Sequence, residues 1–138
     1  MKDKIKCLDL YIKKVSAARK TRYAERPTVK NLSLKREVSH STRLPRRRDN
    51  CFNLTVTDRV TFGAGGGPFR IEVTVEGAIY LNETMTPSEI STLLEDKKNM
   101  DYLVNQSLPY TCAVIADLTD RMGFSPIILA PRSPSAEG

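Results

Sequence analysis

The chain has 138 residues, of which 40% are hydrophobic and 28% are charged, which fits one folded domain and weighs against both a two-domain enzyme and a disordered chain. No apolar run approaches the ~20 residues of a membrane span, and the N-terminal residues lack the apolar stretch of a signal peptide, so we expect no membrane contact and a protein that stays where it is made. The net charge of +6 hides a split, because residues 1–48 hold sixteen Lys and Arg against four Asp and Glu, whereas residues 49–138 hold six against twelve; the basic half can bind nucleic acid, a membrane surface or an acidic partner, or pair with the acidic half.

Two weak strands are predicted in the first 50 residues. Residues 7–17 carry apolar side chains on both faces, which indicates a strand that is buried on both sides at a subunit contact. One of these faces holds Leu8, Leu10 and Ile12, and the other holds Cys7, Tyr11 and Val15. In residues 28–39 a single apolar face is interrupted by Lys30 and Arg36. We interpret residues 39–50 as a polar loop.

Two segments near the middle of the chain alternate between apolar and polar residues. In residues 52–62 the apolar side chains occupy the even positions, with Asp58 as the exception, and in residues 69–81 they occupy the odd positions. This period of two, in segments rich in Val, Ile, Thr and aromatic residues, predicts strands with one buried face. The glycine-rich residues 63–68 between them indicate a reversal, so the two strands should form an antiparallel hairpin.

Two helices are predicted after the hairpin. Thr86-Pro-Ser-Glu89 is a capping box with a proline at the first helical position, which favours a helix start there. Pro109 should end or restart the helical run, with Ser107 as the cap of the restart, and Gly123 should end the second helix. The apolar arc of this second helix spans roughly 200°, about twice what contact with one sheet requires, so we expect the surplus to face another subunit. The arc is made by Leu108, Cys112, Val114, Ile115, Leu118 and Met122.

The order of the predicted elements is four strands followed by two helices. This order predicts an α+β fold in which a four-stranded antiparallel sheet carries the helices on one face. We expect residues 1–131 to form a single domain and residues 132–138 to form a disordered tail.

No arrangement of residues points to catalysis. The three cysteines and the single His40 are too scattered for a zinc site, which needs about four clustered ligands. Glu72 and Glu76 lie on the polar face of a predicted strand, where carboxylates are usually solvated. The glycine-rich run at residues 63–67 lacks the Gly-Lys-Ser/Thr that positions phosphate in a phosphate-binding loop. We therefore expect no enzyme, no cofactor and no metal.

The basic residues leave nucleic-acid binding open as an alternative. Arg43 and Arg46–Arg48, together with the basic residues between 13 and 22, have the charge of a nucleic-acid footprint, and Tyr11 and Tyr23 lie among them. The sequence offers no recognition-helix pattern, so solubility and pairing with an acidic partner are the simpler interpretation.

Several short runs in the chain are distinctive. Pro109-Tyr110 lies in the second predicted helix, and Arg121-Met-Gly-Phe124-Ser-Pro-Ile-Ile-Leu-Ala-Pro131 follows it. Tyr11-Ile-Lys-Lys-Val-Ser16 lies in the first strand, and Glu76-Gly-Ala-Ile-Tyr80 lies in the hairpin. Together these runs resemble the SecB family of protein-export chaperones, and the similarity covers about residues 7–131.

The resemblance implies an ATP-independent chaperone of the bacterial cytoplasm, built as a SecB-like dimer of dimers. Family members hold unfolded or nascent polypeptides and pass preproteins to the SecA translocase motor, whereas related proteins are dedicated chaperones of antitoxins in toxin–antitoxin systems. The family's acidic motor-binding residues of the first strand are replaced here by Lys14 and Ala18, and only Glu72 remains. A lysine repels a basic partner, so the resemblance favours a divergent chaperone with a particular client over hand-over to the motor.

The resemblance also suggests where the partners bind. The predicted client-binding side chains are Tyr23, Met122, Phe124, Ile127, Ile128 and Leu129; for Phe124 and Leu129 the alternative is packing in the domain core. The predicted oligomer interface comprises Tyr11, Val15, Leu108, Cys112 and Ile115.

Overall fold

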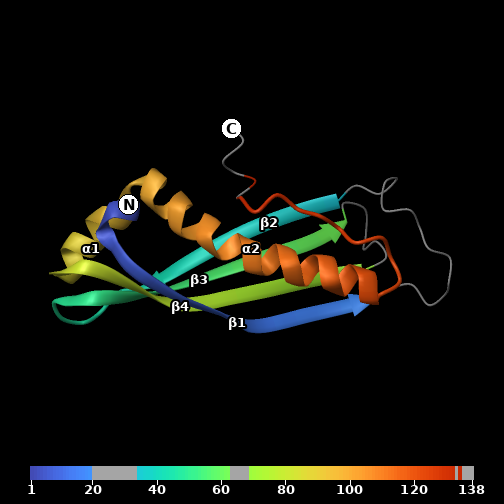
Figure 1. The fold of residues 1–138 in the computed structure, drawn as a ribbon, viewed down its shortest axis with the longest axis horizontal. Coiled ribbons are helices and arrows are strands. Elements are labelled where there is room, and N and C mark those ends of the chain that lie inside the picture. The colour runs from blue at the N-terminus through green and yellow to red at the C-terminus, as the bar shows by residue number, and fades with distance from the viewer. Residues whose placement is uncertain (20–33, 63–68, 133, 135–138) are drawn as a thin grey trace.

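The chain folds as one sheet with a helical layer on one face. The computed structural model describes residues 1–19, 34–62, 69–132 and 134. Its four strands form an antiparallel sheet in the order β1-β4-β3-β2, and both helices lie on the same face (Figure 1). The elements are η1 (Lys2–Lys4, a 3-10 helix), β1 (Ile5–Arg19), β2 (Leu34–Arg43), β3 (Asp49–Phe62), β4 (Phe69–Met85), α1 (Pro87–Glu95) and α2 (Lys97–Arg121). The predicted α+β class is confirmed. Most of the expected tail, residues 133 and 135–138, lies outside the described residues.

β3 and β4 form the centre of the sheet. Buried and half-exposed residues alternate from Phe52 to Phe62 and from Phe69 to Leu81, and the two strands pair antiparallel. The predicted hairpin strands are therefore confirmed, and the predicted reversal at residues 63–68 lies outside the described residues. The alternation of apolar and polar residues predicted these strands correctly because one face of each strand packs against the helices and the other does not.

The buried side chains form two apolar clusters between the sheet and the helices. The first lies beneath α1 and the first half of α2 and includes Leu54, Ile79 and Leu108. The second cluster lies beneath the second half of α2 and extends into the chain that follows this helix. Its buried members are Val60, Phe62, Phe69, Ile71, Val73, Ile115, Phe124 and Ile127.

β2 extends further along the chain than expected. It pairs with β3 from Leu34 to Arg43, so the prediction of a loop over residues 39–50 is wrong outside residues 44–48. β2 is an edge strand with mostly exposed polar side chains, and such a strand leaves no hydrophobic alternation to detect. The start of the predicted strand, residues 28–33, lies outside the described residues.

α1 begins at the predicted capping box. The Oγ1 atom of Thr86 accepts a hydrogen bond from the Glu89 N–H at 3.1 Å, and the Thr86 N–H donates to the Glu89 carboxylate at 3.2 Å. The two bonds satisfy two backbone N–H groups at the start of the helix that would otherwise need water.

Thr86→Ala should lower the free energy of unfolding by about 1 kcal/mol, because the N-cap acceptor is lost. A urea titration followed by circular dichroism measures this change. Thr92→Ala, on the exposed face of α1, is the control and should be close to neutral because alanine is the better helix former. An equal loss in both variants would count against the capping role.

α2 is one continuous helix from Lys97 to Arg121, with Pro109 inside it. The prediction that Pro109 ends or restarts the helix is therefore wrong, and the cap is Asp96, which accepts from the Lys98 N–H at 3.0 Å, not Ser107. The helix changes direction near its middle (Figure 1), as expected where a proline removes a backbone donor. The ring of Pro109 is exposed, so the helix can bend there without disturbing the core.

Candidate client-binding surface

α2 ends in a tight reversal. Gly123 has a φ of 87°, in the left-handed region that favours glycine, and the Phe124 N–H donates to the carbonyl of Thr119 at 3.0 Å. The predicted end at Gly123 is confirmed. The Ile127 N–H also donates to the Thr119 hydroxyl at 2.9 Å. These bonds fix residues 123–132, called here the C-terminal segment, so that the chain returns along α2 on the side of β2 (Figure 1).

The C-terminal segment directs two of the predicted client-binding side chains into the core. Phe124 is 3% exposed and Ile127 is 7% exposed, and the Phe124 ring centre lies 5.1 Å from that of Phe69. Both side chains belong to the second cluster and are buried rather than exposed to a client. For Phe124 this agrees with the alternative of packing in the domain core, and for Ile127 it differs from the predicted exposure. The reason is the reversal at Gly123, which turns the chain toward the sheet.

Ile128 is the most exposed large apolar side chain among the described residues, at 81%. Its neighbour Leu129 and the helix-terminal Met122 are half-buried and pack against the second cluster. We refer to Met122, Ile128 and Leu129 as the C-terminal apolar surface. Tyr23, the remaining predicted client-binding residue, lies outside the described residues.

The wide apolar arc of α2 is largely used within the chain itself. Leu108 and Ile115 are fully buried against the sheet, which does not fit their predicted place in an oligomer interface. Cys112 lies on the flank that the C-terminal segment covers, where its thiol donates to the carbonyl of Ala130 at 3.7 Å. Burial raises the pKa of this thiol. The arc is wide because α2 meets two layers, and a sequence pattern does not distinguish a returning segment from a second subunit.

β1 is an edge strand whose face pattern changes along its length. A register shift between Ile12 and Lys14 brings Ile12 and Val15 to the same face, on the side of the helices. Tyr11 lies on the other face, where its hydroxyl donates to Glu76 at 3.0 Å. The prediction that Tyr11 and Val15 share a face is therefore wrong, because one extra residue in a strand reverses the alternation that follows it.

Apolar side chains remain uncovered where α2 meets β1. Ile12 is 42% exposed and Val15 is 43% exposed on the strand, and Tyr110 is 46% exposed on the helix. Tyr110 lies about 200° around the helix from Cys112, so it occupies the flank away from the C-terminal segment and toward β1. We refer to Ile12, Val15 and Tyr110 as the β1 margin.

A buried ion pair holds the C-terminal segment against the domain. Asp58 is completely buried, at 0% exposure. Arg36 donates hydrogen bonds to both of its carboxylate oxygens, at 2.9 and 2.7 Å. The Thr111 hydroxyl donates to the same carboxylate at 2.6 Å. Burial alone would lower the pKa of Arg36, but the hydrogen bonds and charge of Asp58 raise it on balance. Arg36 also donates to the carbonyl of Ala130 at 2.7 Å, so the pair connects β2, β3, α2 and the C-terminal segment.

Sequence reasoning missed this ion pair although it noticed both partners. Arg36 and Asp58 each interrupt an otherwise apolar face. Opposite charges that interrupt the buried faces of two neighbouring strands are the available signal, because a buried charge requires a partner.

Glu72, the predicted translocase-binding residue, lies on the face of the sheet away from the helices. Its carboxylate is 2.9 Å from Arg59 Nε and 3.9 Å from an Arg70 nitrogen. Lys14 and Ala18 are exposed. The negative charge of Glu72 is therefore already matched within the sheet.

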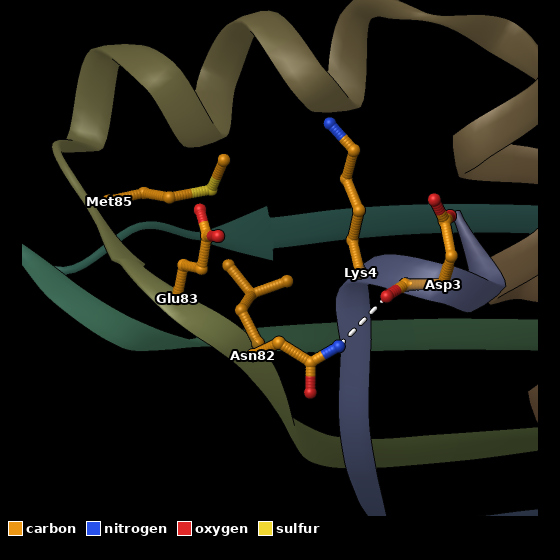
Figure 2. A pocket seen from close by; sticks show the side chains of 6 residues that line it. Asp3, Lys4, Asn82, Glu83 and Met85 are labelled. Carbon is orange, nitrogen blue, oxygen red and sulfur yellow. Dashed lines mark hydrogen bonds between the residues drawn. The ribbon is translucent and has the colours of Figure 1, made fainter.

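A pocket of about 280 Å³ lies between the N-terminus and the end of β4, away from the apolar surfaces. Figure 2 shows Lys4 extending across it toward the helices and Asn82 donating to the Asp3 carbonyl, at 2.8 Å. A hydrogen bond from the terminal ammonium lowers the pKa of Asp3. The lining mixes charged and polar side chains with the apolar Leu81 and Met85.

The described part of the chain offers neither a metal-binding cluster nor a membrane-spanning helix. Residues 1–19, 34–62, 69–132 and 134 contain no group of three or more His, Cys, Asp or Glu side chains able to hold a metal ion. Within the same ranges, no helix is both long enough and apolar enough to cross a membrane.

Comparisons with known proteins agree with this architecture. No family model and no curated protein matches the chain. Among solved structures, the chain is similar to the SecB-like chaperone Rv1957 of Mycobacterium tuberculosis in complex with a ChAD peptide from the Rv1956 HigA1 antitoxin. The two share 14% sequence identity and a TM-score of 0.65, and the match covers 91% of this chain and 85% of that chain. At this identity the likeness establishes the fold alone: the four-stranded sheet with two helices on one face is a SecB-like fold.

Proposed function

We propose that the chain is an ATP-independent holdase of the bacterial cytoplasm, which binds unfolded polypeptide segments at the C-terminal apolar surface. The observation that carries the proposal is the 81% exposure of Ile128 on a segment held at Ala130 by Arg36. A fixed, exposed isoleucine offers an apolar contact that does not depend on the amino-acid sequence of the client. The SecB-like fold supports the same function.

The energetics require several copies of this surface. Burying one isoleucine-sized side chain contributes about 1.5–3 kcal/mol, and ordering of the client offsets much of that gain. A single surface therefore binds weakly, whereas several surfaces that act on one unfolded chain raise the avidity by orders of magnitude. Folded proteins bury their apolar segments and are therefore not bound.

The β1 margin supplies a place where copies can associate. β1 lies at an edge of the sheet, and an edge strand with exposed apolar side chains is a template for association. We propose that a second copy covers Ile12, Val15 and Tyr110, so that each assembly presents more than one C-terminal apolar surface. Light scattering coupled to gel filtration should then give a mass of at least twice 15.5 kDa, and Val15→Asp should reduce it.

Ile128→Ser should weaken binding to an unfolded client by about tenfold, because the lost burial is worth about 1.5 kcal/mol or more. Reduced, carboxymethylated α-lactalbumin is a suitable soluble unfolded probe, and fluorescence anisotropy measures its dissociation constant. Suppression of aggregation should weaken in parallel, as measured by light scattering.

Leu34→Ser is the matched control. Leu34 is also an exposed apolar residue, at 38%, but it lies on β2 outside the C-terminal apolar surface, and its replacement should change binding by less than about twofold. Equal losses in the two variants, or no binding of the probe by the unaltered chain, would contradict the proposal.

A narrower version of the proposal is a dedicated client. Two observations favour it: Lys14 and Ala18 stand where the resemblance would place acidic motor-binding residues, and the similar solved chaperone is bound to an antitoxin peptide. We propose an antitoxin as the leading candidate for such a client. Affinities for a panel of unrelated unfolded proteins test this version, since a general holdase should bind them all within about tenfold of one another.

A further inference from the structure

The face of the sheet opposite the helices is polar and carries an uneven charge. Three of its carboxylates already have basic partners at hydrogen-bonding distance, which removes them as sites for a basic ligand. These pairs are Glu76 with Lys13 at 2.7 Å, Glu72 with Arg59 at 2.9 Å and Glu37 with Lys35 at 3.0 Å.

The unmatched positive charge gathers at the turn between β2 and β3. Arg43, Arg46 and Arg47 are exposed, and no described residue forms an ion pair with any of the three. Arg48 differs, because it donates to the carbonyl of Thr84 at 3.2 Å. Three guanidinium groups at one end of the sheet are therefore available to an anionic partner.

Two adjoining hollows lie beside these arginines and share Arg43 and Asn53. The first, of about 240 Å³, also includes Lys13 and hydroxyl groups of β2 and β3. The second, of about 390 Å³, also includes Arg46 and the apolar side chains of residues 44 and 45. We refer to the two hollows together as the basic groove. It combines cations, hydrogen-bond donors and a small apolar area.

We propose that the basic groove binds an extended acidic segment of a protein partner. Carboxylates of the segment would meet Arg43 and Arg46, which form no ion pair with a described residue, and an apolar side chain between them would rest on residues 44 and 45. Charge-assisted hydrogen bonds from guanidinium to carboxylate are among the strongest that a solvent-exposed site can form. The groove lies apart from Ile128 and the C-terminal apolar surface, so this inference goes beyond the proposed holdase function and does not depend on it.

Nucleic acid fits the groove less well than an acidic peptide does. The lining includes the carboxylate of Asp49, which repels an evenly charged phosphate backbone, whereas a peptide can place its own carboxylates away from it. Single strands are held by stacking on exposed aromatic rings. The aromatic ring in the lining, Phe52, is 2% exposed, and the exposed Tyr11 beside the groove is held by its hydrogen bond to Glu76. An acidic peptide can therefore use the cations, the hydrogen-bond donors and the apolar area of the basic groove together.

Fluorescence anisotropy with a labelled twelve-residue peptide of repeating Asp-Glu-Leu tests the proposal. Replacing Arg43 and Arg46 together by Gln should weaken binding of this peptide by at least about tenfold, since two charge-assisted contacts are lost. The matched control replaces Lys97 and Lys98 by Gln, which removes the same charge from the helical side, and should change binding by less than about twofold. The Arg43/Arg46 variant should still suppress aggregation of an unfolded client as well as the unaltered chain does.

Any of the following results would overturn the proposal. They are the absence of peptide binding by the unaltered chain, an equal loss in the two double variants, and tighter binding of a twelve-nucleotide single-stranded DNA than of the acidic peptide. An Asn-Gln-Leu peptide without carboxylates should not bind, and retained binding of it would also count against the acidic partner. Because aggregation suppression is measured on the same variants, failure of the groove and failure of the holdase function give different results.

Discussion

Arg36→Met should lower the free energy of unfolding by about 3–5 kcal/mol, because it leaves the fully buried carboxylate of Asp58 without its charged partner. The side chain of Arg36 is itself only 10% exposed, so water cannot replace the lost guanidinium. The Thr111 hydroxyl would remain as a neutral donor and would not compensate the charge. A urea titration followed by circular dichroism measures the loss.

The matched control removes both charges. Arg36→Met combined with Asp58→Leu should recover most of the lost stability, because a buried ion pair replaced by apolar residues is often neutral or better. The bond from Arg36 to the Ala130 carbonyl stays broken in the double variant, so amide hydrogen exchange should still be faster in the C-terminal segment. A loss below about 1 kcal/mol in Arg36→Met, typical of a surface ion pair, would contradict the buried role of this pair.

Gly77→Ala should destabilise the chain by about 1–3 kcal/mol, as overpacking does, although alanine normally improves a strand position over glycine. A Cβ atom at Gly77 would overlap the backbone oxygen of Asp9 and lie 2.8 Å from the Cα of Leu10. Both atoms belong to the backbone of β1, so the edge strand must move away. Hydrogen exchange should therefore increase mainly in β1.

Ala78→Gly is the control for this position. It alters the neighbouring residue of the same strand, on the opposite face, and should cost only about 0.5–1 kcal/mol through backbone entropy. Exchange in β1 should then stay close to that of the unaltered chain. A neutral or stabilising Gly77→Ala would show that β1 does not pack as closely on β4 as described.

The sequence was a reliable guide where one physical pattern dominated. β3 and β4 each have one buried face, so alternation identified them, and Thr86 and Gly123 marked helix ends by chemistry that acts within a few residues. The α+β class followed from the order of these elements. The polar edge strand β2 and the register shift in β1 leave no such local signal, which explains why residues 39–43 and the face of Val15 were misassigned.

The candidate site was harder to predict because it depends on contacts between distant residues. Ile127 was assigned to the client-binding surface and Phe124 either to that surface or to the core, and the reversal at Gly123 turns both side chains inward. The ion pair of Arg36 with Asp58 joins residues on different strands. Pro109 was expected to break α2, but its ring is exposed and the neighbouring turns are held by the core, so the helix bends without ending.

The central claim is that unfolded polypeptides contact exposed apolar side chains on the C-terminal segment. A photo-crosslinking amino acid in place of Ile128 tests it most directly, with the same amino acid in place of Glu95, an exposed residue of α1, as the reference position. We expect crosslinks from position 128 to reduced, carboxymethylated α-lactalbumin, few from position 95, and few from either position to native α-lactalbumin. Equal crosslinking from both positions, or equal capture of the native and unfolded forms, would contradict the claim.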